Sequence, residues 1–232
     1  MKKVLLALIA LFVMGFQSLR AQNYEVVYSM KMDAGAIVNM IASESGMPED
    51  MMAFLKDDIK KAKLMVSLHV SKDKSRMHFL KDKSKFEINM MGLKMDAAPM
   101  FDNMGINTYC DYNKKESYTV SHLNGKTYIV RDDELPALNF TKTNEKKTIL
   151  GHQCVKMVDS KNGSVVWYAT DIPFQTKMHP GVPGLVLQMS DDTGGFTFTA
   201  TSFKPTSQPV TLPKNAKKAT KEEVDSLIES MH

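Results

Sequence analysis

Residues 63–71, KLMVSLHVS, decide the fold, because apolar positions recur along them with a period of two. An extended strand points successive side chains to opposite faces of a sheet, so this spacing predicts a β-strand with a buried face. The aliphatic face would carry Leu64, Val66, Leu68 and Val70. The opposite face would carry Met65, Ser67 and His69.

The same alternation continues along most of the chain, from YEVVYSMKM at residues 24–32 to GFTFTATSF at residues 195–203. About eleven short strands fit the pattern. Several are separated by Asn-Gly or Gly-Gly pairs, at 124–125, 162–163 and 194–195, which tolerate the positive φ angles of hairpin turns. We therefore predict a mainly β protein of the α+β class, built on a largely antiparallel sheet.

Two segments depart from this period and predict helices. The first covers about residues 34–62, where Pro48 stands in a first helical turn and an apolar stripe follows at helical spacing. This stripe consists of Met51, Met52, Leu55 and Ile59. The second covers about residues 220–231, where Thr220 and Glu223 have the spacing of a capping box.

The N-terminus has the pattern of a secretory signal peptide at residues 1–21. Two lysines precede an apolar run of 13 residues at 4–16, which is too short to span a bilayer. We expect cleavage after Ala21, a single domain over residues 22–232, and a periplasmic or secreted protein. No later stretch of the sequence has transmembrane length.

Cleavage there would change the charge of the protein. It removes three basic residues and no acidic ones, which lowers the formal net charge from +4 to +1. The exported chain would then have no basic field to attract nucleic acid or an anionic membrane.

Two cysteines, Cys110 and Cys154, remain in the expected exported chain. An even pair in an exported protein predicts one disulfide, whose loop of about 45 residues would stabilise the fold by about 4 kcal/mol in the chain-entropy model. The alternative is a pair of buried free thiols. The sequence lacks a Cys-x-x-Cys motif, which argues against thiol oxidoreductase chemistry.

Methionine is the unusual feature of the composition. Of the 17 methionines after residue 21, 13 fall between Met30 and Met104. Because its side chain is flexible and polarizable, methionine suits an adaptable apolar binding surface. The alternatives are a core built from methionine in place of leucine, and thioether binding of Cu(I).

The sequence carries none of the common catalytic or cofactor-binding motifs, such as HExxH, the nucleophile elbow or the P-loop. An Asp-Thr-Gly run at 192–194 matches the catalytic loop of aspartic proteases, but that chemistry needs two such loops. His69 and His78 could meet across a hairpin, yet no cysteine or carboxylate stands near them at zinc-ligand spacing. We therefore predict no enzyme activity, no cofactor and no metal site.

Two further features are candidates for a binding site. Trp167, the single tryptophan, would either pack in the core or line a pocket. The stretch HPGVPGLVLQM at 179–189 is either a loop that a ligand approaches or a turn that closes one strand and starts the next. We favour the turn, formed by Gly181, Pro183 and Gly184, because proline is excluded from the middle of a sheet and glycine supplies turn dihedrals.

This region resembles the GLPGLI family of exported Bacteroidota proteins. The name motif corresponds to Gly181–Val186, with valine in place of a leucine and of the isoleucine. The segments GHQC at 151–154 and WYATDIP at 167–173 also match, so the resemblance covers about residues 149–190. The N-terminal half is more similar to a neighbouring uncharacterised family of exported proteins.

Both families are similar to proteins with the LolA-like fold of outer-membrane lipoprotein carriers. The resemblance implies an antiparallel sheet curved into an incomplete barrel, with a helical lid and a C-terminal helix. It implies no catalytic residues.

By analogy with those carriers, the first functional hypothesis is an exported protein that holds a lipid, a lipoprotein acyl chain or another apolar ligand without chemistry. The candidate lining residues are Met51, Met52, Leu55, Ile59, Met90, Met95, Met100 and Trp167. The alternative is a structural or interaction protein of the envelope with a closed core and envelope proteins as partners. An enzyme with an unfamiliar site is the third hypothesis.

Overall fold

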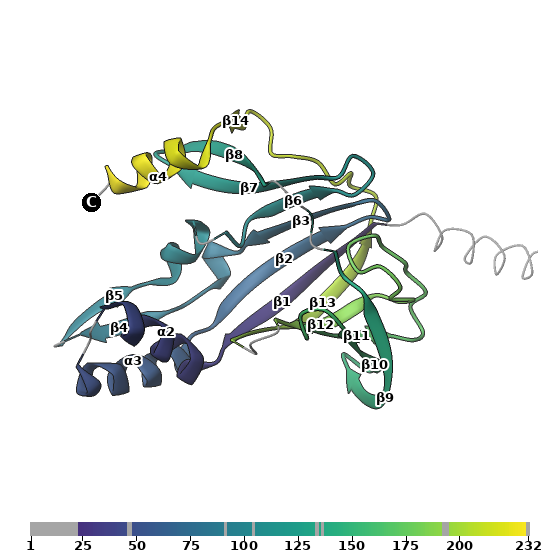
Figure 1. Ribbon diagram of the computed structural model, residues 1–232, viewed down its shortest axis with the longest axis horizontal. Coiled ribbons are helices and arrows are strands. Elements are labelled where there is room, and N and C mark those ends of the chain that lie inside the picture. The colour runs from purple at the N-terminus through teal and green to yellow at the C-terminus, as the bar shows by residue number, and fades with distance from the viewer. Residues whose placement is uncertain are drawn as a thin grey trace, which may run out of the picture.

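The computed structural model describes residues 23–45, 48–90, 92–103, 105–132, 135, 137–191 and 195–230. The expected signal peptide and the Asp-Thr-Gly run lie outside these ranges. Within them, twelve strands form one sheet and two more form a separate hairpin (Figure 1), so the prediction of a mainly β protein is confirmed. No helix in this described part combines the length and the apolar character needed to cross a membrane.

The large sheet has the order β14-β8-β7-β6-β3-β2-β1-β13-β12-β11-β10-β9. All neighbours pair antiparallel except β14 and β8, whose parallel pairing makes the sheet mixed. Its first seven strands in the chain are β1 (Asn23–Met32), β2 (Leu64–Val70), β3 (Lys74–Phe79), β6 (Thr108–Asp111), β7 (Glu116–Leu123), β8 (Lys126–Asp132) and β9 (Phe140–Ile149). The others are β10 (His152–Asp159), β11 (Val165–Ala169), β12 (Val186–Ser190), β13 (Phe196–Thr206) and β14 (Lys217–Lys218).

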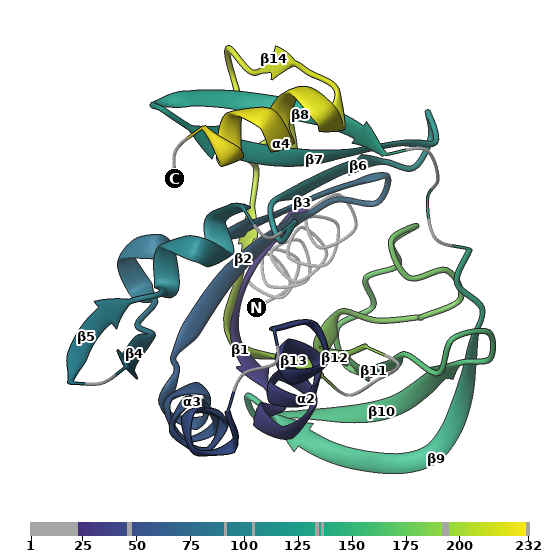
Figure 2. The same ribbon diagram turned by 60° about the vertical axis from the view of Figure 1, so that its left-hand side comes forward.

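The sheet bends strongly, so that β7 and β8 lie on the opposite side of the molecule from β9 and β10 (Figure 2). Register shifts in β1, β10 and β11 mark irregularities of the β-bulge type. Bulges bend a strand and increase its twist, which accounts for part of this curvature. Among the described strands, β14 and β9 stand at the two ends and do not pair, so the sheet stays open.

The main core lies on the inner face of β1 and β2. The register places Tyr28 opposite Val66 and Val26 opposite Leu68, and all four side chains are at most 2% exposed. The Tyr28 hydroxyl donates a hydrogen bond of 2.8 Å to the Val186 carbonyl, so its buried oxygen has a partner. The aliphatic positions of the opening stretch therefore form the core that their spacing predicts.

The opposite face of β2 is also covered, which the alternation alone did not indicate. Met65 is 8% exposed and Ser67 is fully buried. The short 3-10 helices η1 (Lys81–Lys83) and η2 (Ala98–Asn103) contact β2 and β3 respectively. After η1, the Ser84 hydroxyl accepts a hydrogen bond of 2.9 Å from the Met65 amide. Phe101 of η2 packs on Phe79, which pairs with Val66, so η2 lies on the aliphatic face of the sheet.

Two helices lie at one end of the sheet, α2 (Ala34–Ser45) and α3 (Glu49–Lys61), beside the hairpin of β4 (Glu87–Met90) and β5 (Leu93–Asp96) (Figure 1). Ile59 belongs to the main core, and Met52 and Leu55 pack against it. On the side toward the hairpin, the Asn89 amide donates to the Asp58 carboxylate over 2.8 Å. Three residues of the α3 stripe, Met52, Leu55 and Ile59, thus pack in or against the core.

The C-terminal helix, α4 (Lys221–Glu229), contacts β7 and β8. Its predicted capping box is present, because the Glu223 amide donates to the Thr220 hydroxyl over 3.2 Å and the Thr220 amide donates to the Glu223 carboxylate over 2.9 Å. Before it, Val210 packs with Tyr109 and Tyr118. The proline-containing connection after β13 therefore buries part of β6 and β7.

The two cysteines are free thiols. Cys110 lies on β6 and Cys154 on β10, and six other strands stand between these two in the sheet. A disulfide needs Cα atoms within about 7 Å. The expected disulfide is therefore absent. Both thiols are free, but only Cys154 is buried, while Cys110 is half-buried. Sequence spacing gave no information on which strands become neighbours.

We expect Gly184→Ala to destabilise the fold by about 3 kcal/mol or more, because the added Cβ would lie 2.1 Å from the Ala169 carbonyl oxygen and 2.9 Å from the Tyr168 ring. Gly181→Ala is the matched control. Its φ is +80° and its Cβ would meet nothing within 4 Å, so only backbone strain of about 1–2 kcal/mol applies. Urea unfolding measures both, and equal losses would contradict the close contact.

Candidate binding site

A cavity of about 710 Å³ opens where strands β3 and β6 meet a turn from the other half of the chain. Its strand side consists of Ser75, Met77, Thr108 and Cys110. The opposite side consists of Lys177, Met178, His179 and Pro180, which precede β12. Leu135 and Leu138, from the connection between β8 and β9, close the cavity along a third side.

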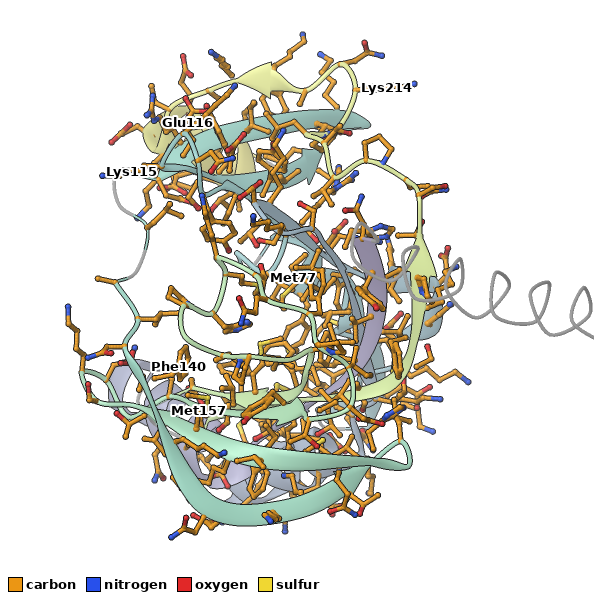
Figure 3. All side chains as sticks on the ribbon, turned by 90° about the vertical axis from the view of Figure 1, so that its right-hand side faces the viewer. Met77, Lys115, Glu116, Phe140, Met157 and Lys214 are labelled. Atoms are coloured by element: carbon orange, nitrogen blue, oxygen red, sulfur yellow. The ribbon has the colours of Figure 1, made fainter. Side chains whose placement is uncertain are left out.

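The walls of this cavity are largely apolar. Met77 comes from β3, and Met178 and Leu138 face the same space from the two connecting segments. In Figure 3, Met77 lies between Lys115 above and Phe140 below, so the cavity spans the interval between the two arms of the curved sheet. Apolar walls of this kind suit the carbon-rich surface of a bound small molecule.

Hydroxyl groups form a polar part of the lining. The hydroxyls of Tyr112 and Ser75 share a hydrogen bond of 3.0 Å, and the Cys110 thiol lies 3.5 Å from the Ser117 hydroxyl. Burial raises the pKa of Tyr112, so its hydroxyl keeps its proton and remains a potential donor at neutral pH.

His179 adds an imidazole to the same cavity. Its side chain is 5% exposed and packs edge-on to the Phe140 ring, with the ring centroids 5.9 Å apart. Burial lowers the pKa of His179 to about 4, because the apolar surroundings disfavour the charged form. At neutral pH the ring is therefore uncharged, with one nitrogen that donates and one that accepts hydrogen bonds.

Backbone hydrogen bonds hold the turn that carries His179. The Val182 amide donates to the His179 carbonyl over 3.1 Å, and Gly181 takes the positive φ of +80° that this turn needs. Past the turn, the Ala169 amide donates to the Leu185 carbonyl over 2.8 Å, which ties the segment to β11. The cavity wall is therefore fixed to the sheet.

Lys177 and Lys115 bring positive charge to the rim of the cavity. The Lys177 ammonium lies 3.3 Å from an Asp73 carboxylate oxygen and also donates to the Asn113 side chain. Lys115, which has a positive φ of 55°, is exposed at the end of the turn between β6 and β7. The lining thus combines apolar, polar and positively charged side chains.

The structure does not gather the predicted lining residues into this cavity. Met51, Met52 and Leu55 are half-buried on α3, Ile59 is in the core, and Met95 is 48% exposed on β5. The side chains of Met90 and Met100 lie outside the described part. A cavity of about 400 Å³ beside α3 has a polar lining, formed by Asp58, Lys61, Lys85, Glu87, Asn89 and Lys94.

Trp167 lies on β11 and is not among the lining residues of the larger cavity. The Lys147 ammonium from β9 stands 3.8 Å from the centre of its ring, which is the geometry of a cation–π contact. Lys147 also donates to the Gln188 side chain on β12. The tryptophan therefore packs within a cross-strand cluster on three strands.

His69 and His78 do meet across the β2–β3 pair, with ring centroids 5.7 Å apart. Glu25 lies 3.6 Å from His69, and burial, with a smaller contribution from the Arg76 charge, lowers the pKa of His78 to about 4. Among the described residues, no group of three or more His, Cys, Asp or Glu side chains is arranged to hold a metal ion.

The motif turn contains Gly181, Pro183 and Gly184, and the segment around it also contributes to the cavity. The two residues before Gly181, His179 and Pro180, line the cavity. The interpretation of this stretch as a turn alone does not account for that contribution. The available signal was a histidine placed directly before the paired prolines and glycines.

Residues 67–229, well over half of the sequence, match the family described as the N-glycanase peptide N-terminal domain, or PNGase F-II N-terminal domain. The chain belongs to this family. The assignment to the GLPGLI family and to a LolA-like lipid-binding group is therefore wrong. Its motifs covered only about residues 149–190, and proline–glycine turns recur in unrelated β proteins. The lipid-carrier hypothesis rested on that analogy and is therefore wrong as well.

Crystal structures of PNGF-II in the C2 and P21 space groups align with this chain at TM-scores of 0.48 and 0.47. The sequence identities are 19% and 18%, and each alignment covers 90% of this chain. It covers 33% of the PNGF-II chain, so the present sequence spans about a third of that protein's length. The comparison with curated proteins gave no match.

Because His179 is buried without charge, we expect the folded protein to lose stability in mild acid. The pKa of His179 is about 4 in the folded protein and 6.5 for a free histidine, so between these values protons bind the unfolded chain preferentially. The neutral ring therefore contributes fully to the free energy of unfolding above pH 6.5. This contribution should fall by about 2 kcal/mol between pH 7 and pH 5.

Chemical unfolding at pH 7, 6 and 5 measures this dependence. We expect His179→Asn to lose less stability over that range than the wild type, whatever its stability at pH 7. His78→Asn should weaken the dependence independently, since burial also lowers the pKa of His78 to about 4. A His179→Asn variant with the full wild-type pH dependence would contradict the burial of this ring.

Proposed function

We propose that this chain is a glycan-binding accessory domain that works alongside N-glycanase chemistry without performing it. Family membership supports the link to N-glycanases, because the matched family is described as the N-terminal domain of such an enzyme. The observation that carries the proposal is the cavity of about 710 Å³, which combines apolar walls with hydroxyl and imidazole groups.

The chemistry of this lining suits a sugar. Sugar rings have apolar C–H faces and hydroxyl edges, so they need both kinds of contact at once. Met77 and Met178 offer flexible apolar surface, whereas the Tyr112 hydroxyl and the neutral His179 ring offer hydrogen bonds. The volume falls in the range of small-molecule sites.

The lining supports binding more than cleavage. Glycoside hydrolysis commonly uses a pair of carboxylates on either side of the scissile bond. None of the described residues that line this cavity is an aspartate or a glutamate. The polar groups that do line it can orient hydroxyl or amide groups of a glycan, which is what an accessory domain requires.

The proposal includes export and a single domain. The signal-peptide pattern of residues 1–21 supports a periplasmic or secreted location, where glycans and glycoproteins are met. One hydrogen-bonded sheet that takes strands from β1 to β14 supports a single domain over residues 22–232.

Calorimetric titration with a neutral N-linked oligosaccharide tests this function. We expect Tyr112→Phe to weaken binding by about tenfold, because it removes a buried hydroxyl that can bond the ligand. Tyr128→Phe is the matched control, since Tyr128 lies beside α4 and not in the larger cavity's lining. Its affinity should equal that of the wild type.

Unfolding curves of both variants establish that each is folded before the affinities are compared. Absence of oligosaccharide binding by the folded wild type would overturn the proposed function. Equal losses in Tyr112→Phe and Tyr128→Phe would show that the larger cavity is not the site.

A further inference from the structure

A second, smaller cavity of about 270 Å³ adjoins the same turn. It is lined by Lys72, Gln175, Thr176, Gly181 and Val182, together with Lys177 and Pro180, and these last two also line the larger cavity. The turn at 177–181 therefore contributes residues to both cavities. We call the two cavities together the turn groove.

Hydrogen bonds hold the walls of the smaller cavity in place. The Lys177 amide donates to the Lys72 carbonyl over 3.0 Å, which ties the segment before the turn to the β2–β3 connection. The Thr176 hydroxyl donates to the Ser71 carbonyl over 3.2 Å and accepts from the Met178 amide over 3.1 Å. Because these walls are set before a ligand arrives, binding would cost little ordering of the chain.

The charges at the turn groove are mainly positive. Lys72 and Lys177 line the smaller cavity, and Lys115 lines the larger one with Lys177. Asp73, 3.3 Å from Lys177, is the carboxylate in contact with these lysines among the described residues. One carboxylate against three ammonium groups leaves a surplus that favours an anion.

We propose that the smaller cavity is a subsite for an acidic sugar, one that carries a carboxylate, sulfate or phosphate, while neutral sugars of the same glycan occupy the larger cavity. This inference rests on the proposed function. The exposed Lys72 ammonium would pair with the anionic group, and Gln175 and Thr176 would face the hydroxyls of that sugar. The volume, below that of drug-sized ligand sites, suits a single sugar unit.

The test compares one branched N-linked oligosaccharide with and without its terminal sialic acids, by calorimetric titration at about 50 mM salt. We expect the acidic form to bind the wild type about tenfold more tightly, since a charge-assisted hydrogen bond distinguishes the two forms. Salt should reduce this preference, because the lysines are exposed.

Lys72→Gln should reduce the preference for the acidic form severalfold and leave the affinity for the neutral form unchanged. Lys214→Gln is the matched control, because Lys214 is exposed and lies far from the labelled cavity residues Met77 and Lys115 (Figure 3). It removes the same charge and should keep the full preference.

Equal affinity of the wild type for the two forms would overturn the acidic subsite and leave the proposed glycan binding intact. Full retention of the preference in Lys72→Gln would also overturn the subsite. If neither form binds the folded wild type, the proposed function fails and the subsite fails with it.

Discussion

Gly184 packs against β11 so closely that a methyl group in its place would lie 2.1 Å from the Ala169 carbonyl oxygen. Directly after it, the Leu185 amide donates to the Ile172 carbonyl over 3.2 Å and the Leu185 carbonyl accepts from the Ala169 amide. These contacts set the position of the chain as it enters β12. Because His179 and Pro180 lie just before this point, both cavities of the turn groove depend on it.

The curvature of the sheet brings the turn close to the strands that form the opposite wall of the site. Ser75 and Met77 lie on β3, near the middle of the sheet, while the turn belongs to the arm formed by β9 to β12. A flat sheet would hold these segments far apart. The bend seen in Figure 2 brings the turn over the inner face of β3 and β6, where it leaves a cavity between them.

Local patterns in the sequence predicted local structure well. The alternation of residues 63–71 gave a buried strand, and Thr220 with Glu223 gave the helix cap that the structure contains, because both depend on neighbours within a few residues. The candidate site depends on long-range contacts instead. Ser75 and His179 stand 104 positions apart in the sequence, and only the order of the strands and the bend of the sheet bring them to one cavity.

The errors have the same origin. An even number of cysteines predicted a disulfide between Cys110 and Cys154, but the strand order of the sheet keeps these two residues apart. The apolar stripe of α3 looked like the lid of a ligand cavity, but Ile59 and its neighbours pack into the core. The short motifs at 149–190 combine residues of β10 and β11 with a proline–glycine turn, which are local features that many β proteins share.

The central claim is that glycan binds in both cavities of the turn groove, which the segment 177–181 helps to line. A crystal structure of the protein with a sialylated N-linked oligosaccharide tests it most directly. The account predicts sugar density beside Met77, Tyr112 and His179, and a carboxylate-bearing sugar beside Lys72. Ordered sugar at another surface with the turn groove unoccupied would contradict it.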